Sequence, residues 1–149
     1  MAIWKRSGFD AASLTQLQAN TMSDGLGIEI VAIGEDTLTA RMPVDHRTIQ
    51  PHGRLHGGAS VALAETVGSI AANLVLDPAE SVGVGLEINA NHVRPVSGGF
   101  VFATARAESL GRTTQIWSIR ITDPADRLVC ICRFTVAVIP AGQAKPVSA

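Results

Sequence analysis

Charged residues are scarce in this chain of 149 residues: they make up 17% of it, against about a quarter in an average soluble domain. A domain with so few charges typically covers part of its surface by self-association, so we expect a homo-oligomer. The 12 lysines and arginines are scattered, and the net charge is −1. Because a phosphate backbone binds to a concentrated basic face, we expect no nucleic-acid partner.

Cysteine is also scarce, and Cys130 and Cys132 are the only two. Residues two apart in a strand share a face, where a disulfide between them would be strained, so we interpret both as packed thiols. The first nine residues carry Lys5 and Arg6 but no apolar run follows them, which argues against a signal peptide. These features favour a cytoplasmic protein.

Several catalytic signatures are missing. There is no HExxH motif and no cysteine cluster, and although His52 and His56 are four residues apart, Gly53 and a helix boundary interrupt their spacing. No Gly-x-Ser-x-Gly elbow, P-loop or dinucleotide fingerprint occurs. We therefore expect neither a metal nor a cofactor.

Hydrophobic periodicity predicts an α+β fold. Asp10 is placed to cap a short helix that runs to about residue 21, and a long helix is expected over residues 57–76. Four strands after one long helix are typical of an antiparallel sheet that packs against that helix. We expect one domain over residues 1–149, with a loose tail from about residue 140. The strands are expected at residues 28–33, 37–44, 83–96, 100–110, 113–122 and 128–139.

Glu65 is the only charged residue in the predicted long helix. The helix has the length of a membrane span, but its polar residues favour a helix enclosed in the protein, with no membrane association. Ser69 and Asn73 follow Glu65 by one and two turns on the same face. This stripe either lines a catalytic cavity, or Glu65 simply binds a backbone group or an arginine at an interface.

The start of this helix offers a site for a developing oxyanion. Gly57 and Gly58 would present free amides at the positive end of the helix dipole, where glycine lets a substrate approach closely. Gln50, in the preceding loop, is able to donate to the same oxygen. A tight turn and an ordinary loop glutamine would account for the same residues.

Gly57 and Glu65 are eight residues apart, or about 12 Å along one helix. An amide and a carboxylate at that separation do not easily meet one carbonyl group. If both act, antiparallel helices from two subunits must bring Glu65 of one beside Gly57 of the other. The catalytic interpretation therefore predicts a dimer with shared active sites.

A family resemblance covers residues 4–139. Residues 50–59 (QPHGRLHGGA), followed by Leu-Ala-Glu at 63–65 and by Ser69, resemble the hotdog-fold acyl-CoA thioesterases, and so do residues 85–95 (GLEINANHVRP). The sequence is most similar to the 4-hydroxybenzoyl-CoA thioesterase branch with a helical Glu. Within that branch it looks especially like the bacterial 1,4-dihydroxy-2-naphthoyl-CoA thioesterases of menaquinone synthesis. The resemblance implies a hotdog fold, in which an antiparallel sheet wraps around one long central helix, and dimers that usually pair into tetramers.

The resemblance also implies roles for individual residues. Glu65 would be the nucleophile or the general base, and the Gly57 amide with Gln50 would polarise the thioester carbonyl. Ser69 would position water, and His56 would orient the loop or the thioester. Coenzyme A, which is part of the substrate, would contact His92, Arg94, Arg112 and Thr113.

We therefore expect hydrolysis of an aromatic, hydroxyaryl acyl-CoA to the free acid and coenzyme A. The thiol of the leaving group has a pKa of about 8.5, so one base or nucleophile and an oxyanion site suffice. Related phenylacetyl-CoA thioesterases carry Asp where this chain has Glu65, which favours the hydroxyaryl branch. Two alternatives stay open: a hotdog hydratase or dehydratase that uses His56 for proton transfer, and a non-catalytic module that binds acyl-CoA.

Overall fold

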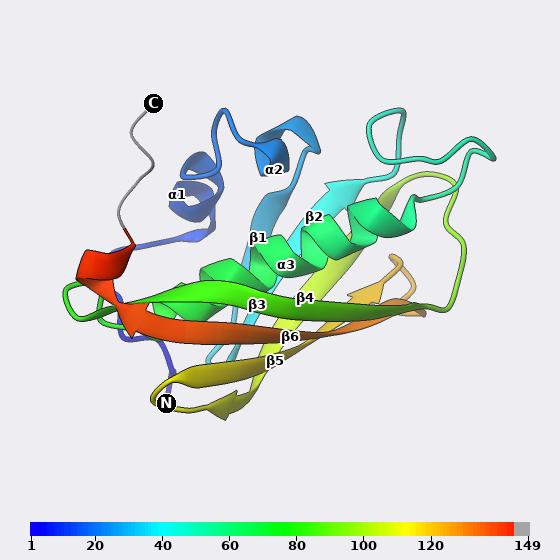
Figure 1. Cartoon of the computed structure of the whole chain (residues 1–149). Helices are drawn as coiled ribbons and strands as arrows, with labels where there is room; N and C mark the ends of the chain where they lie inside the picture. The colour runs from blue at the N-terminus through cyan, green and yellow to red at the C-terminus, as the bar shows by residue number, and fades with distance from the viewer. Residues whose placement is uncertain (145–149) are drawn as a thin grey trace.

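The structure is a computed structural model that describes residues 1–144. Its centre is a six-stranded antiparallel sheet with the order β1-β2-β4-β5-β6-β3 (Figure 1). This is the antiparallel sheet that the sequence predicted. The strands are β1 (Glu29–Ile33), β2 (Thr37–Pro43), β3 (Ser81–His92), β4 (Phe100–Leu110), β5 (Thr114–Thr122) and β6 (Leu128–Pro140).

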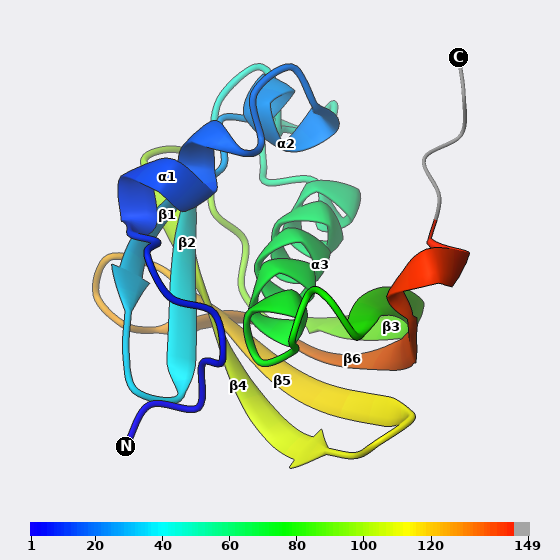
Figure 2. The ribbon, with the colours of Figure 1, turned by 90° about the vertical axis from the view of Figure 1, so that its left-hand side faces the viewer.

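The long helix α3 (Gly57–Leu74) lies across one face of this sheet, and the sheet curves around it (Figure 2). Two short helices, α1 (Ala11–Gln16) and α2 (Met22–Gly25), pack against β1 and α3, respectively. Within the part of the chain that the structure describes, no helix is long and apolar enough to cross a bilayer. The predicted α+β arrangement is confirmed.

The core lies between α3 and the concave face of the sheet. Leu63 and Val67 of α3 are fully buried, as are Trp117 and Phe134 of the sheet. Gly68 allows the close approach, because a β-carbon there would lie 2.8 Å from Cδ1 of Phe134. Small and branched residues on one face of α3 thus set its depth in the sheet.

The first helix is shorter than predicted. Asp10 caps α1 as expected and accepts a hydrogen bond of 2.7 Å from the Ser13 N–H. However, α1 ends at Gln16 rather than at residue 21, because the Gln18 N–H bonds only three residues back, to Thr15 (2.9 Å), and Asn20 then adopts a φ of 62°. This left-handed conformation does not continue a right-handed helix.

The ends of two other elements also differ from the prediction. Helix α3 ends at Leu74 rather than at residue 76, because the Leu76 N–H bonds only three residues back, to Asn73 (3.3 Å). Strand β3 ends at His92 rather than at residue 96, because the next two N–H groups share one acceptor, the carbonyl of Val129.

The predicted loose tail is partly ordered. Strand β6 continues to Pro140, and Ala141–Gln143 form a 3₁₀ turn. The Ala141 N–H donates to the Glu80 carbonyl at 3.1 Å, which ties this turn to the start of β3. The rest of the predicted tail, residues 145–149, lies outside the described residues.

Cys130 and Cys132 are free, buried thiols, with 3.7 Å between their sulfur atoms. The hydrogen bond between them lowers the pKa of Cys130 and raises that of Cys132. Their interpretation as packed thiols is confirmed.

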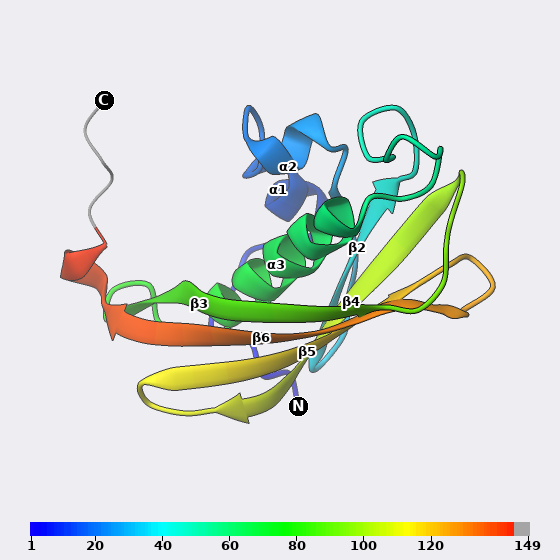
Figure 3. The same ribbon diagram turned by 45° about the vertical axis from the view of Figure 1, so that its right-hand side comes forward.

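Strand β3 is a long edge strand beside α3 (Figure 3). Among the described residues it pairs as a strand with β6 alone. Val84 and Leu86 of this strand are 43% and 64% exposed, and a β-bulge lies at Leu86. A long edge with exposed apolar side chains is a ready template for another strand.

Candidate active site

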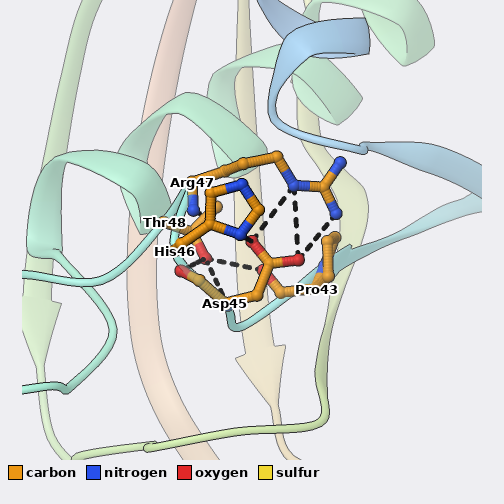
Figure 4. Close-up of polar contacts among 5 residues, drawn as sticks. All are labelled: Pro43, Asp45, His46, Arg47 and Thr48. Atoms are coloured by element: carbon orange, nitrogen blue, oxygen red, sulfur yellow. Dashed lines mark hydrogen bonds and ion pairs between the residues drawn. The ribbon is translucent and has the colours of Figure 1, made fainter.

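The loop between β2 and α3 is held by a polar cluster (Figure 4). Arg47 binds both carboxylate oxygens of Asp45, with 2.7 Å between Nη2 and Oδ2. Thr48 Oγ1 donates to the Pro43 carbonyl at 2.7 Å and accepts from the Asp45 N–H at 3.1 Å. The hydrogen bond from the Arg47 guanidinium lowers the pKa of Asp45 to about 2. This cluster fixes the start of the loop that carries the predicted glutamine.

Gln50 opens a tight turn in this loop. Its N–H donates to the Arg54 carbonyl at 2.8 Å, and Gly53 closes the turn with a φ of 74°. The side-chain oxygen of Gln50 accepts a hydrogen bond from the His52 N–H. Because the side-chain oxygen is already hydrogen-bonded, the Nε2 group of Gln50 is left as a donor to the cavity that Gln50 lines together with Gly57 and His92.

His56 caps α3 and does not line the cavity next to Gln50 and Gly57. Its Nδ1 accepts a hydrogen bond of 2.8 Å from the Gly58 N–H, which requires the proton of the neutral ring to be on Nε2. The ring lines a different cavity beside α2, together with Met22 and Arg47. Among the roles that the sequence left open for His56, this position fits orientation of the loop.

The Gly57 cavity, as we call it, has a volume of about 360 Å³. A β-carbon on Gly57 would lie 2.9 Å from Nε2 of His92, so a side chain there would push this ring aside. No acceptor for the Gly57 N–H is present among residues 1–144. The cavity therefore combines a free amide with several further donors. It is lined by Gln50, Arg54, Leu55, Gly57, Ser60, His92, Val93, Arg94, Pro95 and Val129.

A second cavity, the Glu65 cavity, lies between α1 and α3 and has a volume of about 400 Å³. The predicted polar stripe of Glu65, Ser69 and Asn73 does share this cavity. The Asn73 amide is engaged by the backbone of Gly83, from which it accepts at 2.9 Å and to which it donates at 3.1 Å. The lining is Arg6, Leu14, Leu17, Gln18, Glu65, Thr66, Ser69, Ile70, Asn73 and Leu74.

Most of α3 is buried or half-buried, as expected, but the Glu65 side chain itself is exposed in the single chain. The buried face of α3 is the one against the sheet. The face that carries Glu65 lies beside β3, which is the edge strand of the sheet. The Glu65 carboxylate lies against Gly85 of that strand. It therefore sits at the free edge of the sheet.

The β4–β5 turn, which holds Arg112 and Thr113, lies at the opposite end of the sheet from the end of β3 (Figure 3). His92 pairs with Cys130 of β6, whereas the strand after Thr113 begins opposite Ala137. The span between these two β6 residues is about 23 Å in an extended strand. Within one chain, Arg112 and Thr113 therefore line neither cavity.

Two charged lining residues were not singled out from the sequence. Arg54 belongs to the Gly57 cavity, and its place inside the motif that contains Gln50 is a signal that would have found it. Arg6 belongs to the Glu65 cavity but lies far from Glu65 in the sequence, so no local pattern connects them.

Comparison with known proteins decides the family. The model of the thioesterase superfamily matches residues 52–130, more than half of the chain. This chain belongs to the thioesterase superfamily. It is 47% identical to the 1,4-dihydroxy-2-naphthoyl-CoA hydrolase of Escherichia coli over 137 residues, which cover 92% of this chain and 99% of that protein.

Solved thioesterase structures agree with this placement. The crystal structure of a thioesterase from Haemophilus influenzae matches with a TM-score of 0.91 and 51% identity, covering 93% of this chain and 96% of that one. That of a mutant thioesterase from Pseudomonas aeruginosa matches with a TM-score of 0.90 and 47% identity, covering 93% and 99%. The hotdog fold is confirmed, and this thioesterase-superfamily member is a thioester hydrolase.

The two cavities of this thioesterase hold complementary chemistry. The Gly57 cavity gathers hydrogen-bond donors, which stabilise negative charge on a carbonyl oxygen. The Glu65 cavity supplies a carboxylate, a type of group that can attack a carbonyl carbon directly or activate water for the attack. Within residues 1–144, no group of three His, Cys, Asp or Glu side chains is placed to hold a metal ion.

Proposed function

We propose that this thioesterase hydrolyses an aromatic, hydroxyaryl acyl-CoA to the free acid and coenzyme A, at a site shared between two subunits. One observation carries the proposal: the Glu65 carboxylate lies at the free edge of β3, against Gly85, and in a different cavity from the Gly57 amide. A second subunit at that edge would supply the missing half of the site.

A two-fold axis beside β3 supports this assembly. Pairing β3 with its own copy in antiparallel fashion would cover Val84 and Leu86, which are exposed in the single chain. It would also place the beginning of the partner's β3 beside the end of this one. The Glu65 cavity of each subunit would then face the Gly57 cavity of the other, and we propose that such dimers pair further into tetramers.

In this site, the Gly57 N–H and the Gln50 Nε2 group bind the thioester oxygen as it becomes an oxyanion. Either Glu65 attacks the carbonyl carbon, and water then hydrolyses the resulting acid anhydride, or Glu65 takes a proton from water that attacks directly. Both routes release the coenzyme A thiolate, which needs little acid catalysis. Ser69, one turn from Glu65, positions the water.

Coenzyme A would bind beside the Gly57 cavity, where His92, Arg54 and Arg94 offer donors for its phosphates. In the proposed dimer, the β4–β5 turn with Arg112 and Thr113 approaches this end from the partner. We propose no separate cofactor, since the carboxylate and the amides supply the chemistry. The free thiols of Cys130 and Cys132 fit a cytoplasmic location.

The hydroxyaryl acyl group is supported by similarity. The relative in Escherichia coli that is 47% identical to this chain is named as a 1,4-dihydroxy-2-naphthoyl-CoA hydrolase. Apolar side chains of the Glu65 cavity, such as Leu14 and Ile70, suit an aromatic ring. On this basis we propose a role in menaquinone synthesis.

Thiol release from a panel of aromatic and aliphatic acyl-CoAs, with the wild type beside Glu65→Gln, tests the proposal. We expect fast aromatic turnover by the wild type and a loss of about 100-fold or more in Glu65→Gln, with binding retained. Binding without thiol release in either protein would instead indicate a binding module. Hydrated or dehydrated products with the thioester intact would indicate a hydratase or dehydratase.

A further inference from the structure

The N-terminal segment, residues 1–6, is fixed against the fold by hydrogen bonds at two places. The Ile3 N–H and the Trp4 Nε1–H donate to the turn after β1, at 2.9 Å to the Glu35 carbonyl and 2.7 Å to the Gly34 carbonyl. The backbone of Arg6 then donates to the Leu74 carbonyl at the end of α3, at 3.2 Å. Arg6 therefore has a defined position at the wall of the Glu65 cavity.

The side chain of Arg6 carries a hydrogen-bond donor without a partner at the wall of the Glu65 cavity. Its Nε is buried and has no hydrogen-bond partner among the described residues. No carboxylate in residues 1–144 lies within ion-pair distance of its guanidinium, although Glu65 lines the same cavity. Buried polar groups are nearly always paired in native proteins, so a donor left unpaired beside a cavity is suited to a ligand.

The two charged residues lie toward opposite ends of the cavity. The backbone of Arg6 is bonded at Leu74, which lies about 13 Å along α3 from Glu65. The wall between them includes Leu14 and Ile70, both apolar. A thioester carbonyl at Glu65 would thus have its acyl group directed along an apolar wall toward a cation.

We propose that Arg6 is the specificity residue of the Glu65 cavity and binds an oxygen substituent on the acyl ring, at the end far from the thioester. A guanidinium has donors and no acceptor, so it hydrogen-bonds a phenolic oxygen, and an unsubstituted ring offers no such acceptor at that position. A site that hydrogen-bonds a substrate oxygen discriminates strongly against the analogue that lacks it. This inference rests on the proposed function.

The test compares kcat/KM for a matched pair of substrates, 4-hydroxybenzoyl-CoA and benzoyl-CoA. The variants are Arg6→Met, which removes the donors, Arg6→Lys, which keeps the charge, and Lys5→Met as a control. Lys5 is an exposed neighbour that does not line the cavity, and its replacement removes the same charge.

We expect Arg6→Met to lower kcat/KM for the hydroxylated substrate by about 10- to 100-fold, the effect of losing a hydrogen bond to a charged group. The rate with benzoyl-CoA should change by less than about threefold. Arg6→Lys should retain part of the preference, and Lys5→Met should leave both rates unchanged.

Equal losses on both substrates would overturn the inference, because they would indicate a structural role for Arg6. A wild type that hydrolyses the two substrates equally well would overturn it too, while the proposed function would stand. Only a wild type that releases thiol from neither substrate, nor from the wider panel, would refute the proposed function itself. If circular dichroism shows that Arg6→Met does not fold, Arg6→Lys is the deciding variant. Recognition by a guanidinium fork would be contradicted if Arg6→Lys kept the full wild-type preference for the hydroxylated substrate. It would also be contradicted if Arg6→Lys lost activity equally on both substrates.

Discussion

Oε1 of Glu65 lies 2.9 Å from the position that a β-carbon would occupy on Gly85. The carboxylate of α3 therefore rests on the backbone of the edge strand, at a point where a β-carbon would displace it. The ring of Phe134 approaches the same position to 3.0 Å from the core side. Gly85 thus adjoins both the carboxylate and the packed interior.

Replacement of Gly85 by alanine should displace the Glu65 carboxylate. We expect a fall in kcat of at least about tenfold, because a shift of about 1 Å at a catalytic group is costly. Crowding against Phe134 should also lower the free energy of unfolding by about 1–3 kcal/mol. Thiol release and urea unfolding measure the two effects. Gly98→Ala is the control, because nothing lies within 4 Å of its β-carbon, and full activity in Gly85→Ala would contradict the placement of Glu65.

Shared active sites can be tested by mixing two inactive variants. Glu65→Gln lacks the carboxylate, and Gln50→Ala lacks one oxyanion donor, which typically costs about 100- to 1000-fold in kcat. After subunit exchange, half of the dimers are mixed, and each mixed dimer has one intact site if sites are shared. We expect recovery of about a quarter of the wild-type rate. A site built within one chain would give no recovery, since each mixed dimer would then carry both defects separately.

The position of His56 as a helix cap gives a different kind of expectation. His56→Ala should lower the free energy of unfolding by about 1 kcal/mol, because the Gly58 N–H loses its acceptor. His56→Asn keeps an acceptor of the favoured type and should restore both stability and thiol release. Activity that is lost equally in the Asn and Ala variants would instead indicate that the imidazole contacts the substrate.

The ion pair of Asp45 and Arg47 makes loop stability depend on pH. The pKa of Asp45 falls from its ordinary 3.8 to about 2 in the folded chain, chiefly through the Arg47 hydrogen bond. Since the unfolded chain then binds the proton more tightly, this pair stabilises the fold above about pH 4 and loses its effect as the pH falls toward 2.

We therefore expect Asp45→Asn to be less stable than the wild type at pH 6, with the difference shrinking at pH 3 and below. Urea unfolding at a series of pH values measures this. The Arg47→Met variant should lose the same pH dependence, and the double variant should be no worse than the single ones combined. A difference that persisted unchanged to pH 2 would contradict the role of this ion pair.

Residue spacing within an element predicted the features that depend on neighbours in the sequence. The spacing of Glu65, Ser69 and Asn73 placed them on one face of a helix, and the structure brings them to one cavity. The direction of the His56 ring was not predictable, because a motif shows which residue follows which and not which hydrogen bond a side chain makes. Arg6 reaches the cavity through backbone contacts to the other end of α3, and contacts of that sequence separation leave no periodic signal.

The last residues of α3 and β3 were likewise not predictable from the sequence pattern. The apolar run and the strand pattern located the two elements correctly, but the last residue of each depends on which carbonyl its N–H groups find. The exposure of Glu65 in the single chain depends on where the sheet stops, which is a property of strand order. Strand order is set by long-range pairing, and hydrophobic alternation alone does not specify it.

The two hydrogen bonds between the Asn73 side chain and the backbone of Gly83 join α3 to the edge strand. Helix α3 and strand β3 are thereby held together, with the Glu65 carboxylate on one side and the proposed contact surface on the other. A mutation that shifts how β3 meets a neighbour would carry Glu65 with it. In the proposed dimer, subunit assembly and reaction rate would therefore not be independently adjustable traits, and selection on either one would act on both.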